Sequence, residues 1–353
     1  MTQSHDFLAL EYDELHKIFE EESIPRFRLD QVCHWVYQKN VFEFEHMSSL
    51  SKELRDQLGK LFFIRMPKVL HRQISIDTTR KFLLEVQDAK TIEMVILNDD
   101  GRKTLCISSQ VGCGMGCRFC ATGTQKLERN LKASEIVGQF LTAQKETEKV
   151  SNIVFMGMGE PLANYDNVLK TIRILSHPKM SVFSQRRITV STSGLVPKIR
   201  QLAEQELQIT LAISLSATIN SLRDEIMPIN KTYPLGELRA AAMDYVDKTG
   251  RKVTFEYVLL DGVNTHKQEA RGIVKFIKGI RCNVNLIPYN PYEGSPYKTP
   301  SPATVKEFRN ILEAEDVPVV VRYRRGVDID AACGQLRTKI NNKPKEIQAP
   351  SVP

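Results

Sequence analysis

The chain has 353 residues, a net charge of +7 and a pI near 8.9, and 42% of its residues are hydrophobic and 26% charged. These fractions are those of a soluble globular protein with a sizeable core. No apolar run approaches the ~18 residues that cross a membrane and no signal peptide opens the chain, which excludes an integral membrane protein and predicts a cytoplasmic location. There, cysteines favour metal binding or catalysis over structural disulfides. The positive charge is compatible with a nucleic-acid partner, but many basic proteins bind none.

Residues 1–75 are predicted to form a helical accessory domain. Apolar residues recur at helical spacing in LEYDELHKIFEEE, LDQVCHWVYQK and SKELRDQLGKLF, and such stripes favour packing into a core. The basic and aromatic residues between the stripes fit either a nucleic-acid-binding face or an ordinary solvated one. These residues are Arg26, Arg28, His34, Tyr37 and Lys39.

From residue 76 onward the pattern predicts strands. KFLLEVQD and TIEMVILND indicate a β-hairpin linker over 76–103, and a strand–helix alternation follows over 104–336. Such alternation predicts parallel strands with right-handed crossovers. Six units are too few for a closed eight-stranded barrel, so we expect a partial (β/α)6 TIM-like barrel. The six strands are expected at 104–109, 152–157, 187–193, 209–215, 253–259 and 283–287, with a candidate edge strand near 317 and a disordered tail over 337–353.

Three cysteines in QVGCGMGCRFCATG form the most informative motif of the chain. Cys113, Cys117 and Cys120 have C-x3-C-x2-C spacing, and no His or Cys lies within twelve residues downstream. A closed zinc site or an ordinary cubane cluster needs four ligands. Three thiolates therefore predict a [4Fe–4S] cluster whose fourth iron is open to a substrate or cofactor. The alternatives are a zinc knuckle completed by a distant residue, or buried cysteines that act as small hydrophobic residues.

Distinctive residues also follow the other predicted strands. MGMGEP (156–161), STSG (191–194) and SLSA (214–217) follow strands two to four, and Asn290 follows strand six. The chemistry of barrel folds lies at the C-terminal ends of the strands. Glycines and hydroxyl groups are common in such loops, so it is their convergence on one face that predicts a site.

The combination of CGMGCRFC with GMGEP resembles the radical S-adenosylmethionine (SAM) enzymes. TLCISSQVGC, RNLKASEI, FMGMGEPLANYDNV, RRITVSTSG, NVNLIPYNP and GVDIDAACGQL further resemble the RlmN/Cfr family of RNA adenine methyltransferases, in order and spacing, over residues 104–336. FRLDQVCHWVYQK is similar to the accessory helical domain of that family, which implies an RNA-binding role for residues 1–75. The resemblance implies a radical SAM barrel with one [4Fe–4S] cluster per chain and SAM as cofactors.

The resemblance also implies roles at matching positions. Cys113, Cys117 and Cys120 match the cluster ligands, and Gly159 and Glu160 match the motif that receives the SAM amino group. The remaining positions that match cofactor contacts are Ser191, Ser214, Leu215, Ser216 and Asn290. Ser216 departs from the family, which usually has His there in S-L-H-A. A backbone contact could survive this change, whereas a side-chain contact would be altered.

Three further positions match the catalytic residues of the family. The C2 and C8 carbons of adenine are not nucleophilic, so a radical route is needed. The resemblance assigns the methyl-carrying cysteine to Cys333, the base that removes the ring proton to Glu93, and the thiol that releases the product by forming a disulfide with Cys333 to Cys106. Cys33 and Cys282 have no partner motif and favour a structural role.

The predicted substrate is a specific adenine of 23S rRNA, methylated at C2, with an adenine of the tRNA anticodon loop as a second candidate. Methylation at C8, as in the Cfr branch, uses the same catalytic residues, although LIPYNPYEGSPY resembles the C2 branch better. A metal-stabilised RNA-binding protein without catalytic activity is the alternative of another class. Arg322, Arg324 and Arg325, with Tyr323 among them, fit either an RNA contact or an ordinary basic edge strand. A reductant such as flavodoxin or ferredoxin is the expected partner, and a monomer is the expected state.

Overall fold

The computed structural model describes residues 4–99, 101–147, 149–322 and 324–337. It begins with a module of three helices, α1 (Tyr12–Glu21), α2 (Arg26–Tyr37) and α3 (Lys52–Leu61), as the apolar stripes predicted. Ser51 caps α3 by accepting a hydrogen bond from the Leu54 N–H at 3.3 Å. Two short paired strands, β1 (His5–Asp6) and β2 (Phe62–Phe63), tie the two ends of the module together.

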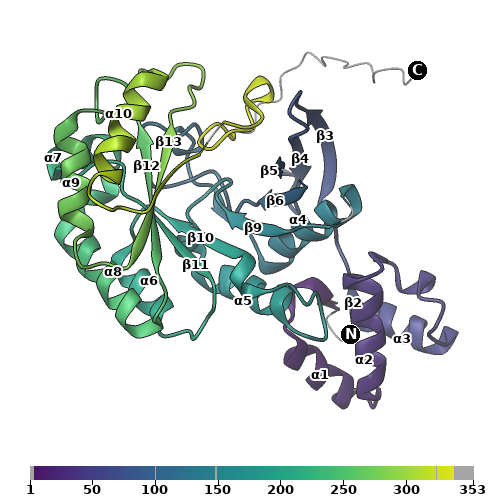
Figure 1. Ribbon diagram of the computed structural model, residues 1–353. Helices are drawn as coiled ribbons and strands as arrows, with labels where there is room; N and C mark the ends of the chain where they lie inside the picture. The colour runs from purple at the N-terminus through teal and green to yellow at the C-terminus, as the bar shows by residue number, and fades with distance from the viewer. Residues whose placement is uncertain (1–3, 100, 148, 323, 338–353) are drawn as a thin grey trace.

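Ion pairs and an aromatic stack join this module to the rest of the chain. In Figure 1 the module lies beside helix α5 (Tyr165–Ser176). Lys170 of α5 pairs with Glu14 at 2.7 Å, and the rings of Tyr12 and His177 stack with centroids 4.4 Å apart. The contact thus places the module against the outer helical layer of the barrel.

A ten-stranded sheet forms the body of the molecule. Its order is β14-β13-β12-β11-β10-β9-β6-β5-β4-β3, and every pair from β6 to β14 is parallel. The strands are β3 (Lys68–Ile74), β4 (Arg80–Glu85), β5 (Thr91–Asp99), β6 (Arg102–Cys106), β9 (Asn152–Phe155), β10 (Ile188–Thr192), β11 (Thr210–Ser214), β12 (Val253–Leu259), β13 (Cys282–Pro288) and β14 (Val319–Val321). The two ends of this order are different strands, so the expected partial barrel is confirmed, and β14 is the predicted edge strand.

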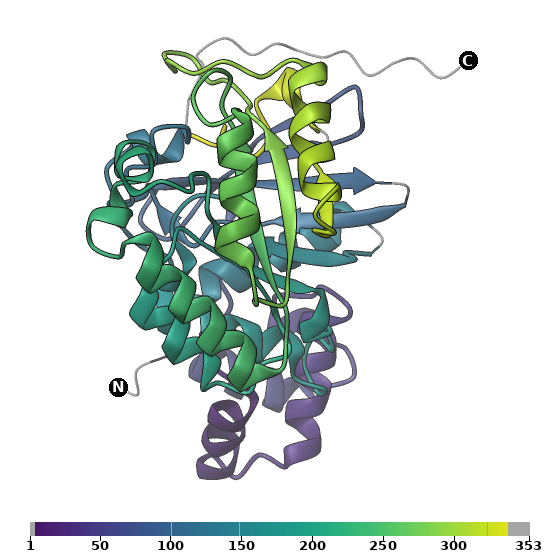
Figure 2. The ribbon, with the colours of Figure 1, turned by 60° about the vertical axis from the view of Figure 1, so that its left-hand side comes forward.

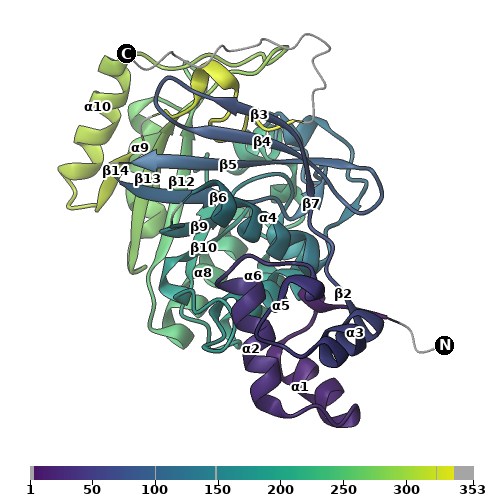
Figure 3. The ribbon, with the colours of Figure 1, turned by 90° about the vertical axis from the view of Figure 1, so that its right-hand side faces the viewer.

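The first strands extend the barrel as an antiparallel sheet. The pairs β3–β4, β4–β5 and β5–β6 are all antiparallel, which confirms the predicted hairpin. Strand β3 lies inside the range 1–75 that the sequence assigned to the helical domain, and it belongs to the sheet instead. Figure 3 shows β3 to β6 one above another, with the C-terminal segment close to β3 and β4.

Helices cover the outside of the parallel strands. These are α4 (Ala133–Glu146), α5, α6 (Val196–Ala203), α7 (Asn220–Ile226), α8 (Leu235–Thr249), α9 (Lys267–Ile277) and α10 (Pro302–Glu313), and Figure 2 shows the green and yellow-green ones in front of the strands. Single 3-10 turns lie at Phe7–Ala9, Phe44–His46, Thr122–Thr124, Pro161–Asn164, Gln185–Arg187, Pro228–Lys231 and Val327–Ile329. Among the described residues, no helix is both long and apolar enough for a membrane span.

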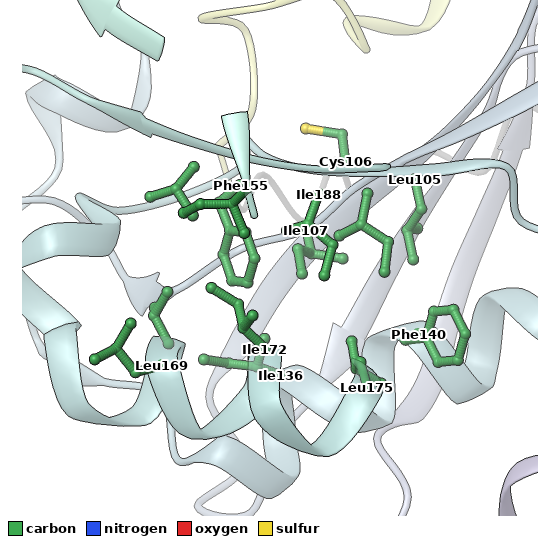
Figure 4. Close-up of a cluster of buried hydrophobic side chains, with 14 of the residues drawn as sticks. Leu105, Cys106, Ile107, Ile136, Phe140, Phe155, Leu169, Ile172, Leu175 and Ile188 are labelled. Atoms are coloured by element: carbon green, nitrogen blue, oxygen red, sulfur yellow. The ribbon is translucent and has the colours of Figure 1, made fainter. Parts of the chain in front are cut away.

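Alternation along the strands separates the core from the barrel interior. Side chains of β6, β9 and β10 such as Leu105, Phe155 and Ile188 pack against Ile136 of α4 and Ile172 of α5, and all five are buried (Figure 4). Cys106 follows Leu105 and points to the opposite side of the sheet, away from this cluster. The core therefore fixes the direction of Cys106 toward the barrel interior.

Candidate active site

The three-cysteine loop lies between two short strands, β7 (Gln110–Val111) and β8 (Arg129–Asn130). The Cys120 N–H donates to the Cys117 carbonyl at 3.2 Å, so the loop turns back on itself between two of the sulfurs. The backbone of Gly123 packs directly against this turn, where a side chain would not fit, because a Cβ there would lie 2.6 Å from the Cys117 carbonyl oxygen. The loop is therefore folded tightly enough to hold the three sulfurs in fixed directions.

The chemistry of these cysteines fits an iron–sulfur cluster better than a single ion. All three are free and partly buried, and among the described residues no three His, Cys, Asp or Glu side chains converge as ligands of one metal ion. A cubane spreads three thiolates over three irons and needs no such convergence. Burial raises the pKa of Cys113 to about 12, and the neighbouring Cys120 adds to the shift. Positive charge is needed here to stabilise the thiolates, and a cluster would supply it.

Arg223 of α7 is a buried cation beside this loop that the sequence did not single out. Its Nη2 donates to the carbonyls of Ser193 and Ser214 at 2.8 and 2.9 Å, and its Nε donates to the Leu215 carbonyl at 3.0 Å. Burial lowers the pKa of Arg223 to about 10, and the nearby Cys117 opposes this shift. The guanidinium thus ties together the loops that follow β10 and β11 and places a positive charge near the cysteines.

Glu160 lies in the loop after β9 and is almost fully buried. Its Oε2 accepts hydrogen bonds from the backbone N–H and the hydroxyl of Ser193 at 2.7 and 2.8 Å. Burial raises the pKa of Glu160, and the bonds from Ser193 counteract this effect. Gly159 has φ +99°, and a Cβ there would lie 2.5 Å from the Gln110 Cβ. Only glycine therefore lets Glu160 approach the cysteine loop this closely.

The other predicted cofactor residues lie at neighbouring strand ends. Ser191 and Ser214 are half-buried at the C-terminal ends of β10 and β11, and Leu215 is fully buried directly after β11. Ser216 is fully buried with φ +52°, and its Oγ accepts a hydrogen bond from the Val258 N–H at 3.4 Å. The hydroxyl that replaces the usual imidazole is therefore directed toward β12, and the Ser216 carbonyl accepts a hydrogen bond from Asn264 Nδ2 at 2.8 Å.

Asn290 follows β13 and carries an unpaired buried atom. Its Oδ1 is buried and accepts no hydrogen bond from the described residues, while its Nδ2 donates to the Cys333 carbonyl at 3.4 Å. A buried polar atom without a partner is costly unless a ligand supplies one. This oxygen fits a donor group of SAM, such as an amine or a hydroxyl.

The three predicted catalytic residues converge on the interior face of the sheet. Val95, two residues after Glu93, pairs with Cys106, so Glu93 and Cys106 share one face of β5 and β6. Cys333 lies in the segment after the Val327–Ile329 turn. The residue as a whole is exposed, but burial of its thiol raises the pKa of that thiol to about 11. The nearby Cys333 also adds to the raised pKa of the buried Cys106, although burial is the main cause. Both are free thiols.

Two hydrogen bonds join the Cys333 segment to the cysteine loop. The Ala121 N–H donates to the Gly334 carbonyl at 2.7 Å, and the Thr122 hydroxyl donates to the Leu336 carbonyl at 2.5 Å. Residues more than two hundred positions apart in sequence thus form one site. Figure 1 shows the yellow C-terminal segment reaching from the barrel strands toward β4 and β5.

The basic residues before Cys333 are only partly available to a ligand. Arg325 pairs with Asp99 at 2.7 Å, whereas Arg322 is exposed and its backbone N–H donates to the Leu286 carbonyl at 2.8 Å at the sheet edge. Arg324 is exposed, and Tyr323 lies outside the described residues, as do positions 338–353 of the predicted tail. Of the cysteines with no predicted role, Cys33 is fully buried and Cys282 is half-buried.

Comparison with known proteins identifies the family of this chain. Residues 107–274 match the radical SAM superfamily, and residues 5–64 match the ribosomal RNA large subunit methyltransferase N-terminal domain. The probable dual-specificity RNA methyltransferase RlmN of Syntrophomonas wolfei is 46% identical over 349 residues, which cover 95% of this chain and 98% of the relative. The dual-specificity RNA methyltransferase RlmN of Rhodospirillum rubrum is 45% identical over 94% of this chain and 80% of its own length. The chain belongs to the RlmN family of radical SAM RNA methyltransferases.

The fold of this RlmN-family chain is also that of a solved relative. The crystal structure of a radical SAM methyltransferase from Sphaerobacter thermophilus superposes with a TM-score of 0.91 at 42% identity, over 95% of this chain and all of the other. The sequence prediction of a radical SAM methyltransferase is therefore confirmed at the level of family and fold. The residues Gln110, Ser193 and Arg223 were missed as supports of the site, although Ser193 lies within the STSG motif.

Proposed function

We propose that this RlmN-family chain methylates C2 of a specific adenine in 23S rRNA, with an adenine of the tRNA anticodon loop as a second substrate. Cys113, Cys117 and Cys120 would hold a [4Fe–4S] cluster. Gly159, Glu160, Ser191, Ser214, Leu215, Ser216 and Asn290 would surround SAM. The dual specificity in the names of the relatives supports two RNA substrates. One observation carries the proposal: Cys106 and Cys333 are neighbours beside the three-cysteine loop.

Each catalytic residue has a defined task in this proposal. When bound, the cluster and SAM together supply the radical chemistry that an unreactive aromatic carbon requires. Cys333 would carry a methyl group taken from SAM as a thioether, and, once one hydrogen atom has been removed from that methyl group, would present the resulting carbon to C2 of the adenine. Glu93 accepts the C2 proton at a carboxylate oxygen.

Product release needs only this chain's two thiols and an external reductant. The Cys106 thiolate attacks Sγ of Cys333, so an S–S bond forms while the bond between Sγ and the transferred carbon breaks. The released carbon takes up a proton and becomes the methyl group. An external dithiol then supplies two electrons and two protons, which reduces the disulfide to the two free thiols while the dithiol becomes a disulfide.

The site also suggests how its partners would be used. An adenine inside a helix is out of reach of a barrel interior, so the base must come from a loop or be flipped out of its stack. The helical module would bind the RNA around it. A flavodoxin or ferredoxin would supply electrons to the cluster, and we propose that the chain works in the cytoplasm as a monomer.

One experiment separates this function from its alternatives. Anaerobically purified protein is assayed for iron and sulfide, and then for methylation of 23S rRNA fragments and tRNA with SAM and a reductant. About four irons per chain and 2-methyladenosine, identified by mass and NMR, are expected. Cys333→Ala should abolish methylation, whereas Cys282→Ala should retain it.

The other outcomes overturn specific parts of the proposal. 8-Methyladenosine would assign the chain to C8 chemistry. Zinc in place of iron, together with RNA binding without turnover, would indicate a binding protein. Methylation that persists in Cys333→Ala would exclude the methyl-cysteine route.

A further inference from the structure

Lys81 is a buried lysine directly beside the proposed base. It lies on β4, its side chain is about one-tenth exposed, and its Nζ is 3.3 Å from Oε1 of Glu93 on β5. Lys81 pairs with Val95, two residues after Glu93, so the ion pair is a diagonal contact on the interior face of the sheet. Lysine is almost never buried without a partner, so burial of this ammonium group depends on Glu93.

The same two side chains hold both flanks of the segment that carries Cys333. Lys81 Nζ also donates to the Asp330 carbonyl at 3.3 Å, three residues before Cys333. Oε2 of Glu93 accepts from the Arg337 N–H at 2.9 Å, four residues after it. Both oxygens of the carboxylate are therefore engaged, and its plane is fixed relative to the cysteine.

Charges around Glu93 act in opposite directions. Burial raises the pKa of Glu93, and the Lys81 ammonium is the strongest influence that lowers it; the Arg337 N–H also lowers it, and the nearby Asp330 raises it. The loop after β9 brings a neutral group to Glu93, because the Glu93 N–H lies 3.4 Å from the Met158 sulfur. Lys81 is thus the cation that opposes protonation of a carboxyl group in a poorly solvated place.

We propose that Lys81 is a positioning residue for the base: it keeps Glu93 ionised and oriented toward the carbon that Cys333 presents. A protonated Glu93 cannot accept the adenine proton, so its ionised fraction limits the rate. Lys81 therefore acts through Glu93 and not on the substrate itself. This inference rests on the proposed role of Glu93.

The test compares Lys81→Met, Lys81→Gln and Lys81→Arg, with Lys68→Met as the control because Lys68 is exposed on β3 of the same sheet. Loss of deuterium from C2-labelled adenine in single turnover is followed against pH. An opposite charge nearby typically lowers a carboxyl pKa by about 1–3 units. Lys81→Met and Lys81→Gln should therefore slow the reaction at least about tenfold at low pH and shift the acidic side of the pH–rate profile to higher pH. Lys81→Arg and the control Lys68→Met should leave the acidic side of the profile where it is.

A second readout does not need the loaded enzyme. The infrared band of protonated Glu93 is identified by its loss in Glu93→Gln, and its titration is followed in the apo protein. In Lys81→Gln, which can still donate to the Asp330 carbonyl and so preserves the fold, the band should appear at higher pH than in the unsubstituted protein.

Three outcomes decide the matter. An equal loss of rate at every pH with an unmoved infrared band would give Lys81 a purely structural role and overturn the inference. A shifted band with a shifted rate profile supports it. Full activity of Glu93→Gln would refute the role of Glu93 as base, and with it the effect of Lys81 on catalysis, even if the band still shifts.

Discussion

Replacement of Arg223 by Met tests the support of the strand ends most directly. The change removes the guanidinium and leaves the carbonyls of Ser193, Ser214 and Leu215 without these donors. Hydrogen bonds to charged groups contribute about 1.5–3 kcal/mol each, so the three together give roughly 4–9 kcal/mol.

Part of this loss is offset, because Arg223 no longer has to be buried as a cation. The fall of its pKa from 12.5 to about 10 corresponds to about 3 kcal/mol of unfavourable solvation. We therefore expect Arg223→Met to lower the free energy of unfolding by about 1–6 kcal/mol. Arg223→Lys should cost less, because it keeps the charge and one or two of the bonds.

Urea denaturation of the apo protein measures the effect. Arg200→Met is the matched control, because Arg200 pairs with Asp244 at 3.0 Å on the surface, with both side chains about half exposed. Such exposed pairs contribute about 0–1 kcal/mol. If Arg223→Met is as stable as Arg200→Met, the carbonyl bonds of Arg223 are not a support of the fold, and the reasoning from burial fails.

Three further substitutions test individual parts of the site. Asn290→Leu removes the unpaired Oδ1 together with the 3.4 Å bond from Nδ2 to the Cys333 carbonyl, so the stability of the apo protein in urea should change little while SAM affinity, measured by calorimetry, falls at least about tenfold. Cys106→Ala should allow addition to RNA but block release, so a covalent complex should accumulate on a denaturing gel; free methylated RNA would contradict the role of Cys106. Asp77→Asn should remove a pH-dependent contribution to the free energy of unfolding. Burial of Asp77 raises its pKa, but the hydrogen bonds from Gly326 and Thr79 outweigh this effect and lower the pKa to about 2. The stabilisation by Asp77 is therefore present above about pH 4 and is lost as the pH falls toward 2. Equal sensitivity of Asp77→Asn and the unsubstituted protein to acid unfolding would contradict this.

The sequence predicted the elements that carry strong local patterns. Six strand positions, the hairpin and the edge strand near 317 all lie where the structure has them, because period-two apolar runs between helical stripes leave few alternatives. The cysteine spacing was equally informative, since three ligands in eight residues have few structural uses. Strand β3 was missed because KVLHRQI is largely exposed, and an exposed strand has no apolar alternation.

The supporting residues could not be found in the same way. Arg223 stands in NSLRDEI, where a basic residue on a short helix is expected to face solvent, and only the packing of α7 against the ends of β10 and β11 buries it. Lys81 begins KFLLEVQD and reads as the polar first residue of a strand. Its burial depends on the Cys333 segment, some 250 positions away, and no local pattern reports such a contact.

The antiparallel extension, strands β3 to β5, explains how the segment that carries Cys333, residues 325–337, is held in place beside the barrel. The parallel strands alone end in an open edge, whereas β3 to β5 and their turns place side chains along this segment. Asp99 pairs with Arg325, Asp77 accepts from the Gly326 N–H at 2.8 Å, and Ser75 donates to Asp328. Lys81 and Glu93 continue this row toward Cys333. The extension thus contacts this segment on both sides of the cysteine, at residues 325–330 before it and at the Arg337 N–H after it, and the cysteine loop binds the carbonyls of Gly334 and Leu336. Cys333 lies where these two sets of contacts meet, so any shift of either support changes the distance between its sulfur and Cys106.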